Sequence, residues 1–325
     1  MEFAAVRDFI GRNGKFLITA HETPDGDAIG SECAMLAALR ALGKKASIVN
    51  ADPTPRKFAY LAGTGEILEL SDASQLPEDL EEHVLLILDT NDTHNIGQVA
   101  KLVIPRVKES FIIDHHENDE DITAGNLIQK NASSTAEILY QLFRELKIPV
   151  DRDMAQSLFT AIVYDTGSFI YPKTTALTFS IARDLVAAGV QPNVVYTHLY
   201  ESNSISALVL QSRVMATLEL AHGNHVAIIT MRRETLLDSG AIYEESDQLI
   251  NIPLKSEDIR VSVFFKENAE GLMRCSMRSK GNIDVASISQ SFGGGGHRTA
   301  AGFKCSQSLE ATRDIILSRL SGYFA

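Results

Sequence analysis

The sequence predicts an α/β protein: a larger N-terminal domain with a mainly parallel sheet flanked by helices, a helical linker, and a smaller C-terminal α/β domain with a mixed sheet. Short apolar runs alternate with amphipathic segments in the first half of the chain, which is typical of buried parallel strands and covering helices. Beyond residue 221, two strand-like runs are joined by the turn sequence NAEG. A chain of 325 residues with 45% hydrophobic content is also more typical of two domains than of one.

The first half contains four apolar runs that are too short for helices and are bounded by polar turns. Each is predicted to be a strand buried in a parallel sheet. Apolar residues at helical spacing, ending before Gly43, predict a helix between the first two strands. Two further helices follow the strands, the first capped by Ser133 or Ser134 and the second ending near Asp165. The strands are expected at 15–20, 45–52, 83–88 and 110–113, and the helices at 28–42, 133–146 and 153–165.

The second half begins with a more polar helical stretch, in which the sequence ESNSIS is the least regular point. We therefore expect a catalytic domain at 1–191, a helical linker at 192–220 and a second domain at 221–325. The second domain is expected to contain three strands, at 225–231, 259–267 and 271–277, and two helices, at 283–292 and 308–320.

Charge and cysteine content exclude several classes of protein. Lys and Arg number 30 against 42 Asp and Glu, a formal net charge of −12, so we expect no binding of long nucleic acids through a general basic field. Three cysteines without CxxC spacing predict neither a disulfide framework nor a zinc-thiolate site. The N-terminal sequence lacks a signal peptide, and no apolar run approaches membrane-spanning length. We expect a cytoplasmic protein with no membrane contact.

Side chains that can bind metals follow three of the predicted strands, where the carboxyl ends of a parallel sheet meet. Singly, these residues are more often turn or cap residues, and Asp25 or Asp27 could cap the next helix. A calcium-binding EF-hand loop is excluded, because the twelfth position from Asp25 is Leu36 instead of Glu. Three strand ends together favour a metal site. The residues concerned are His21, Asp25, Asp27, Asp89, Asp114, His115 and His116.

Asp165 extends this set, because a carboxylate at a helix C-terminus opposes the helix dipole and a nearby cation would compensate it. The predicted metal ligands are His21, Asp25, Asp27, Asp89, His115 and Asp165. They supply enough oxygen and imidazole ligands for two divalent ions, and they include no thiolate. This ligand chemistry suits manganese better than a structural zinc ion.

The same residues carry a resemblance to a known family. The sequences HETPDGDAIGSE, LDTND, IDHHEND and YDTGSF, in this order, resemble the four metal-binding motifs of the DHH phosphoesterase superfamily. KNASSTAEIL, between the third and fourth motifs, is also similar to that family. The resemblance covers roughly the first 170 residues. It implies one ion bound by His21, Asp25 and Asp89, a second bound by Asp27, Asp89, His115 and Asp165, and Asp89 as the bridge.

The resemblance also implies a chemistry, which is attack on phosphorus by hydroxide that the two ions generate from water. His116 would then hydrogen-bond the phosphoryl group or the leaving oxygen, and Asp114 would orient a histidine. Directly after the DHH motif, the acidic run from Glu117 to Asp121 departs from the less charged turn expected in the family. It is either a solvated loop or a feature that restricts longer anionic substrates.

The C-terminal half contains a glycine run in a locally basic segment. From Ile259 to Cys305 there are seven Lys and Arg against three Asp and Glu. The glycines allow close approach of a ligand and can form an anion-binding nest of backbone N–H groups, although most glycine runs are flexible loops. The segment resembles the DHH-associated domain with its GGGH motif. The predicted substrate-binding residues are Arg278, Ser279, Lys280, Gly294, Gly295, Gly296, His297 and Arg298.

Two domains of this size resemble most closely the nanoRNase and pAp phosphatase subgroup. This resemblance implies a manganese-dependent, dimeric hydrolase that acts on dinucleotides and other very short RNAs and on pAp, gripping the substrate between its two domains. A soluble phosphodiesterase for cyclic di-AMP or pApA is the nearest alternative, because the motifs are shared. A non-catalytic nucleotide-binding module is an alternative of another class, but the intact ligand set argues against it.

Overall fold

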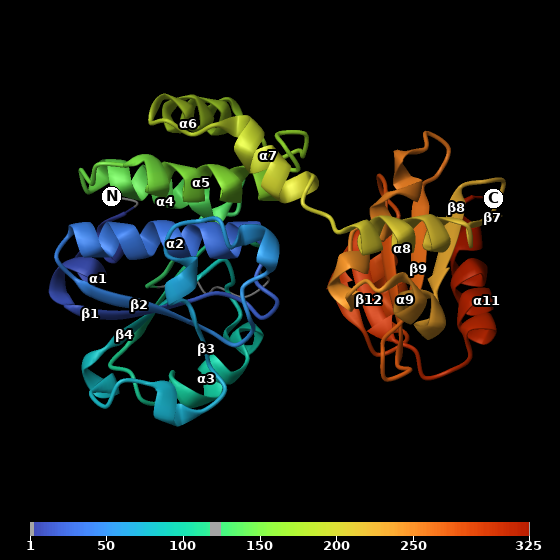
Figure 1. The fold of residues 1–325 in the computed structure, drawn as a ribbon, viewed down its shortest axis with the longest axis horizontal. Helices are drawn as coiled ribbons and strands as arrows, with labels where there is room; N and C mark the ends of the chain where they lie inside the picture. Colours follow the sequence, from blue (N-terminus) through green and yellow to red (C-terminus); the bar gives the residue numbers. More distant parts are fainter. Residues whose placement is uncertain (1–2, 118–124, 325) are drawn as a thin grey trace. The chain divides into compact units, whose positions relative to one another are not determined.

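The computed structural model describes residues 3–117 and 125–324, and only the backbone of His297. The chain divides into two compact units, Met1–Ser202 and Asn203–Ala325, which are coloured blue to yellow and yellow to red in Figure 1. Each unit has a sheet of its own. Among the helices of the described ranges, none is both long enough and apolar enough to cross a membrane.

The first unit is built on a six-stranded sheet in which every neighbouring pair of strands is parallel. The strand order is β3-β2-β1-β4-β5-β6, so the predicted parallel sheet is confirmed. The two short outer strands were not predicted, because each has only two residues. The strands are β1 (Lys15–Thr19), β2 (Lys45–Asn50), β3 (Leu68–Glu69), β4 (Val84–Leu88), β5 (Ser110–Asp114) and β6 (Leu127–Ile128).

Helices cover both faces of this sheet, so the strands are apolar on both sides. One face packs under α1, α2, α4 and α5 through residues such as Ile18, Leu86 and Ile113. The other face packs on α3 and short turns through Leu17, Leu85 and Ile87. Figure 1 shows α2, α4 and α5 on one side of the sheet and α3 on the other. The helices are α1 (Ala4–Arg12), α2 (Gly26–Ala41), α3 (Gln98–Leu102), α4 (Thr135–Glu145), α5 (Arg152–Asp165), α6 (Ala176–Ala187) and α7 (Pro192–Tyr200).

The strand order determines where a ligand can bind in the first unit. From β1 the chain moves outward to β2 and β3, and it then returns to β4 on the other side of β1 before moving to β5 and β6. Loops that leave the carboxyl ends of β1 and β4 therefore diverge and leave a crevice between them. His21 follows β1 and Asp89 follows β4. The fold places the predicted ligands at this crevice.

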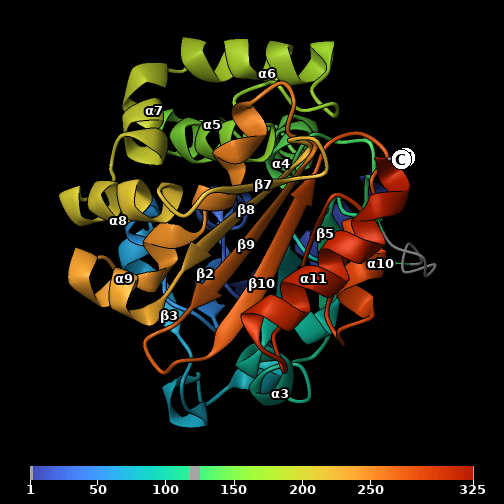
Figure 2. The same cartoon turned by 90° about the vertical axis from the view of Figure 1, so that its right-hand side faces the viewer.

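The second unit contains a six-stranded sheet in the order β11-β12-β10-β9-β8-β7. The sheet is mixed, as predicted, but of its six strands only β8, β9 and β10 were expected. The β8 and β9 strands are parallel and the other neighbours are antiparallel. One face packs on α10 and α11, and the other packs partly under α8 and α9. Figure 2 shows β8, β9 and β10 side by side. The elements are α8 (Ile205–Met215), β7 (Glu219–Ala221), β8 (Val226–Met231), α9 (Arg233–Ser239), β9 (Val261–Glu267), β10 (Met273–Ser279), α10 (Val285–Gln290), β11 (Gly295–His297), β12 (Ala300–Lys304) and α11 (Leu309–Leu320).

The stretch expected as a separate linker, residues 192–220, is divided between the two units. Val195 of α7 is buried in the core of the first unit, and Leu210 of α8 is buried in a core of the second. The break between units falls after Ser202, within the sequence ESNSIS. Each helix has enough apolar residues to pack on its own unit, so only a few residues connect the two.

The glycine run forms part of a strand instead of a loop. Gly295 and Gly296 pair with Gly302 and Ala301 of β12. An added Cβ at Gly296 would lie 2.5 Å from the Ala300 carbonyl oxygen, and the φ of Gly296 is +134°. Glycine is required there because the two backbones approach closely and because other residues rarely adopt this φ.

A buried carboxyl group in α2 makes stability of the first unit dependent on pH. Glu32 is fully buried, its Oε2 accepts a hydrogen bond of 2.9 Å from Asn50 Nδ2, and its Oε1 has no partner among the described residues. Burial raises the pKa of Glu32 to about 8 from an ordinary value of 4.5. The folded chain therefore holds this proton up to a higher pH than the unfolded chain does.

Replacing Glu32 by Gln should remove this pH dependence. Above pH 4.5 the unfolded wild-type chain releases the proton that the folded chain retains, so the free energy of unfolding falls by about 1.4 kcal/mol per pH unit as pH rises toward about 8. Glu32→Gln keeps the acceptor for Asn50 and has no such proton. Its advantage in thermal unfolding midpoint over the wild type should grow from pH 5 to pH 8. An exposed control, Glu81→Gln, should follow the wild type, and a parallel pH dependence in Glu32→Gln would contradict the assignment.

Candidate metal centre

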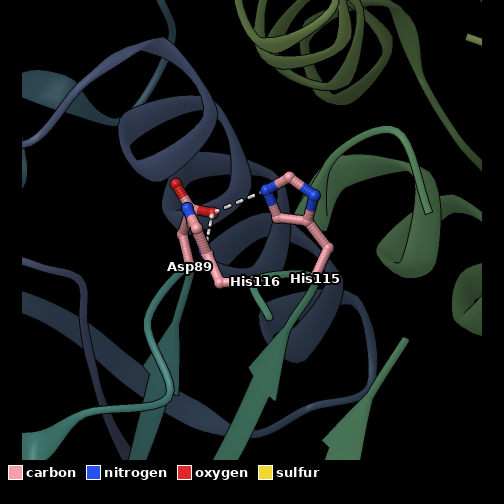
Figure 3. Close-up of side chains that lie close together, drawn as sticks. All are labelled: Asp89, His115 and His116. Atoms are coloured by element: carbon pink, nitrogen blue, oxygen red, sulfur yellow. Dashed lines mark ion pairs between the residues drawn. The ribbon is translucent and has the colours of Figure 1, made fainter. Parts of the chain in front are cut away.

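Four segments of the first unit bring the predicted ligands together. His21 follows β1, Asp89 follows β4, His115 and His116 follow β5, and Asp165 ends α5. Asp25 and Asp27 lie at the start of α2. Among the residues that the structure describes, three groups have ligand atoms within 4.8 Å of one another, and Figure 3 shows one of them, in which Asp89 lies close to both histidines. The groups are His21 with Asp25 and Asp89, Asp27 with His115 and Asp165, and Asp89 with His115 and His116.

Asp89 lies between the other ligands, with one oxygen toward each side. Its Oδ2 is 3.7 Å from Nε2 of His21, and its Oδ1 is 3.6 Å from Nε2 of His115. The backbone of Asp89 has φ +60°, in the left-handed region that non-glycine residues rarely adopt. This conformation costs free energy, and the buried position of Asp89 keeps it in place. One carboxylate is thus available to two sites.

His115 presents an imidazole nitrogen to the second group of ligands. Its Nδ1 lies 3.2 Å from the Ala132 carbonyl oxygen, which is an acceptor, so Nδ1 carries the proton and Nε2 has a free lone pair. This Nε2 is buried, has no hydrogen-bond partner among the described residues, and lies 3.2 Å from Asp165 Oδ2 and 3.8 Å from Asp27 Oδ2. Burial, with a contribution from His116, lowers the pKa of His115 to about 4. A neutral imidazole surrounded by carboxylates is suited to binding a cation.

The N-terminus of α4 orients two of the buried aspartates, Asp27 and Asp89. The backbone N–H groups of Thr135 and Ala136 donate to the two oxygens of Asp27, at 2.6 and 3.1 Å. The Thr135 hydroxyl donates to Oδ1 of Asp89 at 3.0 Å. These donors satisfy part of each carboxylate and use N–H groups that a helix leaves unpaired in its first turn. Thr135 therefore holds Asp27 and Asp89 in position together.

Asp25 combines the two roles that the sequence left open. Its Oδ1 accepts hydrogen bonds from the N–H groups of Asp27 and Ala28, at 2.9 and 3.1 Å, so it caps α2. It also belongs to the group with His21 and Asp89. Capping fixes the carboxylate beside His21, and the two roles support each other.

His116 is paired with a buried carboxylate. Its Nδ1 is 2.7 Å from Oδ1 of Asp114, which is fully buried. Burial lowers the pKa of His116, but hydrogen bonding and attraction to Asp114 outweigh it, and the net effect raises that pKa. The side chain remains 37% exposed. His116 is thus a partly exposed, oriented imidazole that holds a proton more firmly than an ordinary histidine.

The carboxylates of the site repel one another. Burial and the nearby Asp25 raise the pKa of Asp27 to about 6, and burial and Asp27 raise that of Asp165 to about 8. Burial and the charge of Asp27 also raise the pKa of Asp89 well above its usual range. Bound divalent cations would offset this repulsion and the desolvation of the charges. The unpartnered Nε2 of His115 and the oxygen-rich, thiolate-free ligand set both fit such ions.

Sequence reasoning missed two residues beside this site. Thr135 was included in a predicted helix and in the KNASSTAEIL segment but was given no role, although a Ser-Ser-Thr run before a helix signals donors at its N-terminus. Lys173 was not considered, and its Nζ lies 3.2 Å from the His115 carbonyl oxygen. Burial is the largest influence on both neighbouring side chains, and it lowers the pKa of His115 and raises that of Asp165. The charge of Lys173 makes a smaller contribution, which lowers the pKa in both cases. No local pattern marks Lys173, because only the turn after α5 brings it to β5.

The predicted substrate-binding residues of the second unit lie at one end of its sheet. Arg278 and Ser279 end β10, and the N–H of Ser279 donates to the Thr299 carbonyl, one residue after Arg298. The Arg278, Lys280 and Arg298 side chains donate to main-chain carbonyls.

The glycine run supplies fewer donors to this end of the sheet than the predicted nest requires. The N–H groups of Gly293 and Gly294 donate to the carbonyls of Gln290 and Ser289, which corrects the expectation that these groups form an anion-binding nest. The side chain of His297 lies outside the described residues.

The acidic run after the DHH motif is described only in part. Glu117 is exposed. Asp119, Glu120 and Asp121 lie outside the described residues.

Replacing Thr135 by Val should weaken metal binding without changing any predicted ligand. Valine keeps the shape but removes the hydroxyl that donates to Asp89. Loss of such a supporting hydrogen bond typically costs roughly 10- to 100-fold in metal affinity. Calorimetric titration of the metal-free protein with Mn²⁺ would measure the loss. Thr135→Ser keeps the hydroxyl and should bind like the wild type, whereas equal affinities for all three proteins would show that Thr135 does not position Asp89.

Comparison with known proteins agrees with this geometry. Residues 15–162 match the model of the DHH family, N-terminal domain, and residues 223–324 match the DHHA1 domain. The chain is 30% identical over 291 residues to the bifunctional oligoribonuclease and PAP phosphatase NrnA of Thermus thermophilus, covering 89% of this chain and 83% of the relative. It is 25% identical to the cyclic-di-AMP phosphodiesterase GdpP of Bacillus subtilis, but that match covers 96% of this chain and only 49% of the relative.

A solved structure shows the same fold along almost the whole chain. The exopolyphosphatase-related protein of Bacteroides fragilis has a TM-score of 0.92 and 26% sequence identity, over 99% of this chain and 96% of the other. Two matching family models in the expected order, together with a relative at 30% identity, establish the family. The chain belongs to the DHH/DHHA1 phosphoesterases.

Proposed function

We propose that this phosphoesterase hydrolyses dinucleotides and other very short oligoribonucleotides to mononucleotides, and that it removes the 3′-phosphate of pAp. The observation that carries the proposal is the position of Asp89, with one oxygen toward His21 and the other toward His115. This arrangement suits two ions that share a carboxylate, as in two-metal hydrolysis of phosphate esters. The similarity to NrnA over most of both chains supports the choice of substrates.

In this proposal, His21, Asp25 and Asp89 hold one divalent ion, and Asp27, Asp89, His115 and Asp165 hold the other. When bound, the ions would lower the pKa of water and neutralise charge that develops on the phosphoryl group. The chain keeps Asp27 and Asp89 oriented through the N-terminus of α4. Because the binding residues are buried or half-buried, little reorganisation is needed during the reaction.

His116 would act on the substrate directly. Asp114 orients its ring and favours the protonated imidazole. A protonated, partly exposed imidazole beside Asp89 can donate a hydrogen bond to a phosphoryl oxygen or to the leaving oxygen. Asp114 itself is fully buried and acts only through His116.

The second unit would hold the remainder of the substrate. Arg278 and Arg298 supply positive charge, and Lys280 supplies a further charge and donors. The hydroxyl of Ser279 donates to the Ile283 carbonyl and would act as an acceptor or through its position beside Arg278. Gly295, Gly296 and His297 complete the proposed set, and Gly294 would contribute only close approach of its backbone. A local basic segment explains how a chain with net charge −12 binds an anionic substrate.

The proposed holoenzyme contains two manganese ions per chain and is a homodimer. Oxygen and imidazole ligands without thiolate support manganese. The dimer is an expectation from the family alone. Light scattering of the purified protein would test the dimer, and a monomer would contradict it. Metal analysis would test the manganese, and a zinc-loaded protein would contradict that part of the proposal.

The second candidate function is hydrolysis of cyclic di-AMP or its linear product pApA. The match to GdpP, which covers 96% of this chain, favours it. The metal ligands would serve either substrate equally, so the difference must lie in the residues that hold the bases and the second phosphate.

Product analysis with a linear diribonucleotide, pAp and cyclic di-AMP in the presence of Mn²⁺ separates the two functions. The first proposal predicts rapid turnover of the diribonucleotide and pAp and at least a 100-fold loss in Asp89→Ala, because both ion sites lose a ligand. Preference for cyclic di-AMP would replace the proposal by the second candidate. No turnover that depends on Asp89 would refute both.

Arg278→Ala should separate substrate binding from chemistry. We expect the kcat/KM for a diribonucleotide to fall at least 10-fold, since hydrogen bonds to charged groups are the strong ones. Hydrolysis of a small aryl phosphodiester, which lacks the second nucleoside, should change less than two-fold. Arg319→Ala, which removes an exposed cation from α11 of the same unit, is the control. Equal losses on both substrates would contradict the role of Arg278.

A further inference from the structure

Three cationic side chains lie in one row across the sheet of the second unit. Arg274 of β10 is directly opposite Lys266 of β9 on one side and Lys304 of β12 on the other. Residues directly opposite one another in antiparallel strands point to the same face. Like charges in such positions destabilise a sheet unless something compensates them. The row therefore needs an explanation beyond folding.

Only one of the three cations is compensated within the described part of the chain. Lys266 is buried, forms an ion pair with Asp247, and lies 4.5 Å from the centre of the Tyr243 ring. Arg274 and Lys304 are both exposed, and neither has an ion-pair partner among the described residues. Two adjacent positive charges are thus available to an external anion.

These two cations line a cavity of about 280 Å³. The lining also includes Tyr243, whose hydroxyl is buried and has no hydrogen-bond partner in the described structure, and Asn268. A buried hydroxyl without a partner is costly, so a ligand that accepts its hydrogen bond would be favoured. Two cations, a hydroxyl and an amide at the edge of one cavity match the chemistry of a phosphate group. We call this cavity, lined by Tyr243, Asn268, Leu272, Met273, Arg274, Lys304 and Cys305, the Arg274 cavity.

The Arg274 cavity is separate from the predicted substrate-binding residues but shares a strand with them. Arg274 and Arg278 are four residues apart on β10, so both project from the same face of the sheet. At about 3.4 Å per residue they are separated by roughly 14 Å. That distance corresponds to about four stacked nucleotides at roughly 3.4 Å each, and to fewer nucleotides if the RNA is extended. A dinucleotide at Arg278 would not reach the cavity, whereas a longer oligonucleotide would.

We propose that the Arg274 cavity is a second phosphate subsite, which binds a backbone phosphate of oligoribonucleotides of about four or five nucleotides. This inference rests on the proposed function, since it assumes that short RNA is bound at Arg278. It specifies the substrate class further: the second unit contacts the RNA backbone at two places, and it binds longer members of the class more tightly than dinucleotides. Lys266, which is paired with Asp247, lies over the ring of Tyr243 and helps to hold that side chain at the edge of the cavity.

The test compares a diribonucleotide with a pentaribonucleotide, using the Mn²⁺-loaded full chain. In the variant Arg274→Ala/Lys304→Ala, the KM for the pentamer should rise about 10-fold, while kcat/KM for the dimer stays within two-fold of the wild type. The pentamer KM should also become less sensitive to salt, because two cations no longer displace counterions. Arg319→Ala should resemble the wild type with both substrates. Unchanged KM for the pentamer, or equal losses with both lengths, would overturn the proposal.

A binding experiment keeps this inference separate from the proposed function. The fluorescence anisotropy of a labelled pentaribonucleotide, measured with metal-free protein, does not require hydrolysis. If the wild type hydrolyses no RNA but the double variant still binds the pentamer about 10-fold more weakly, the proposed function fails and the subsite stands. If the wild type hydrolyses RNA and the double variant binds the pentamer normally, the subsite fails and the function stands.

Discussion

The first unit depends on a pair of buried carboxylates, Asp27 and Asp89, that are held close together where water cannot screen them. Asp27 is 0% exposed and Asp89 is 2% exposed, burial raises the pKa of both, and the charge of Asp27 raises the pKa of Asp89 further. The protein stabilises them in three ways: through the N–H groups at the start of α4, through the Thr135 hydroxyl, and through an arrangement that suits cations. The left-handed backbone of Asp89 costs further free energy, and in this conformation its two oxygens face His21 and His115.

The sheet makes this arrangement possible. Because β1 and β4 are neighbours at the point where the strand order reverses, His21 and Asp89 emerge side by side from segments far apart in the sequence. The adjacent β5 adds His115, and the packing of α5 against α2 brings Asp165 to the same place. The sheet is stabilised by helices on both of its faces, and this stability offsets the free-energy cost of a site that is unfavourable without bound ions.

Much of this could be predicted from the sequence, because strand ends and ligand types are local signals. Apolar runs that are followed by Asp or His predicted β1, β4 and β5 and the candidate ligands at their ends. The resemblance to the family also predicted that Asp89 is a ligand shared by two ions. Thr135 and Lys173 could not be found in this way, because their roles depend on contacts with residues more than 40 positions away. The glycine run was predicted as an anion-binding nest, and its pairing with β12 was not foreseen, because that pairing is a tertiary contact.

The central claim is that the first unit has two ion sites. Asp89 belongs to both sites, and His115 belongs to one of them. The most direct test is calorimetric titration of metal-free protein with Mn²⁺, combined with metal analysis, for the wild type, His115→Ala and His94→Ala. His94 is a matched control, since it is 93% exposed and lies outside the three ligand groups. The account predicts two ions per chain for the wild type and His94→Ala, and loss of one for His115→Ala. Binding of a single ion by the wild type, or of two by His115→Ala with unchanged affinity, would contradict it.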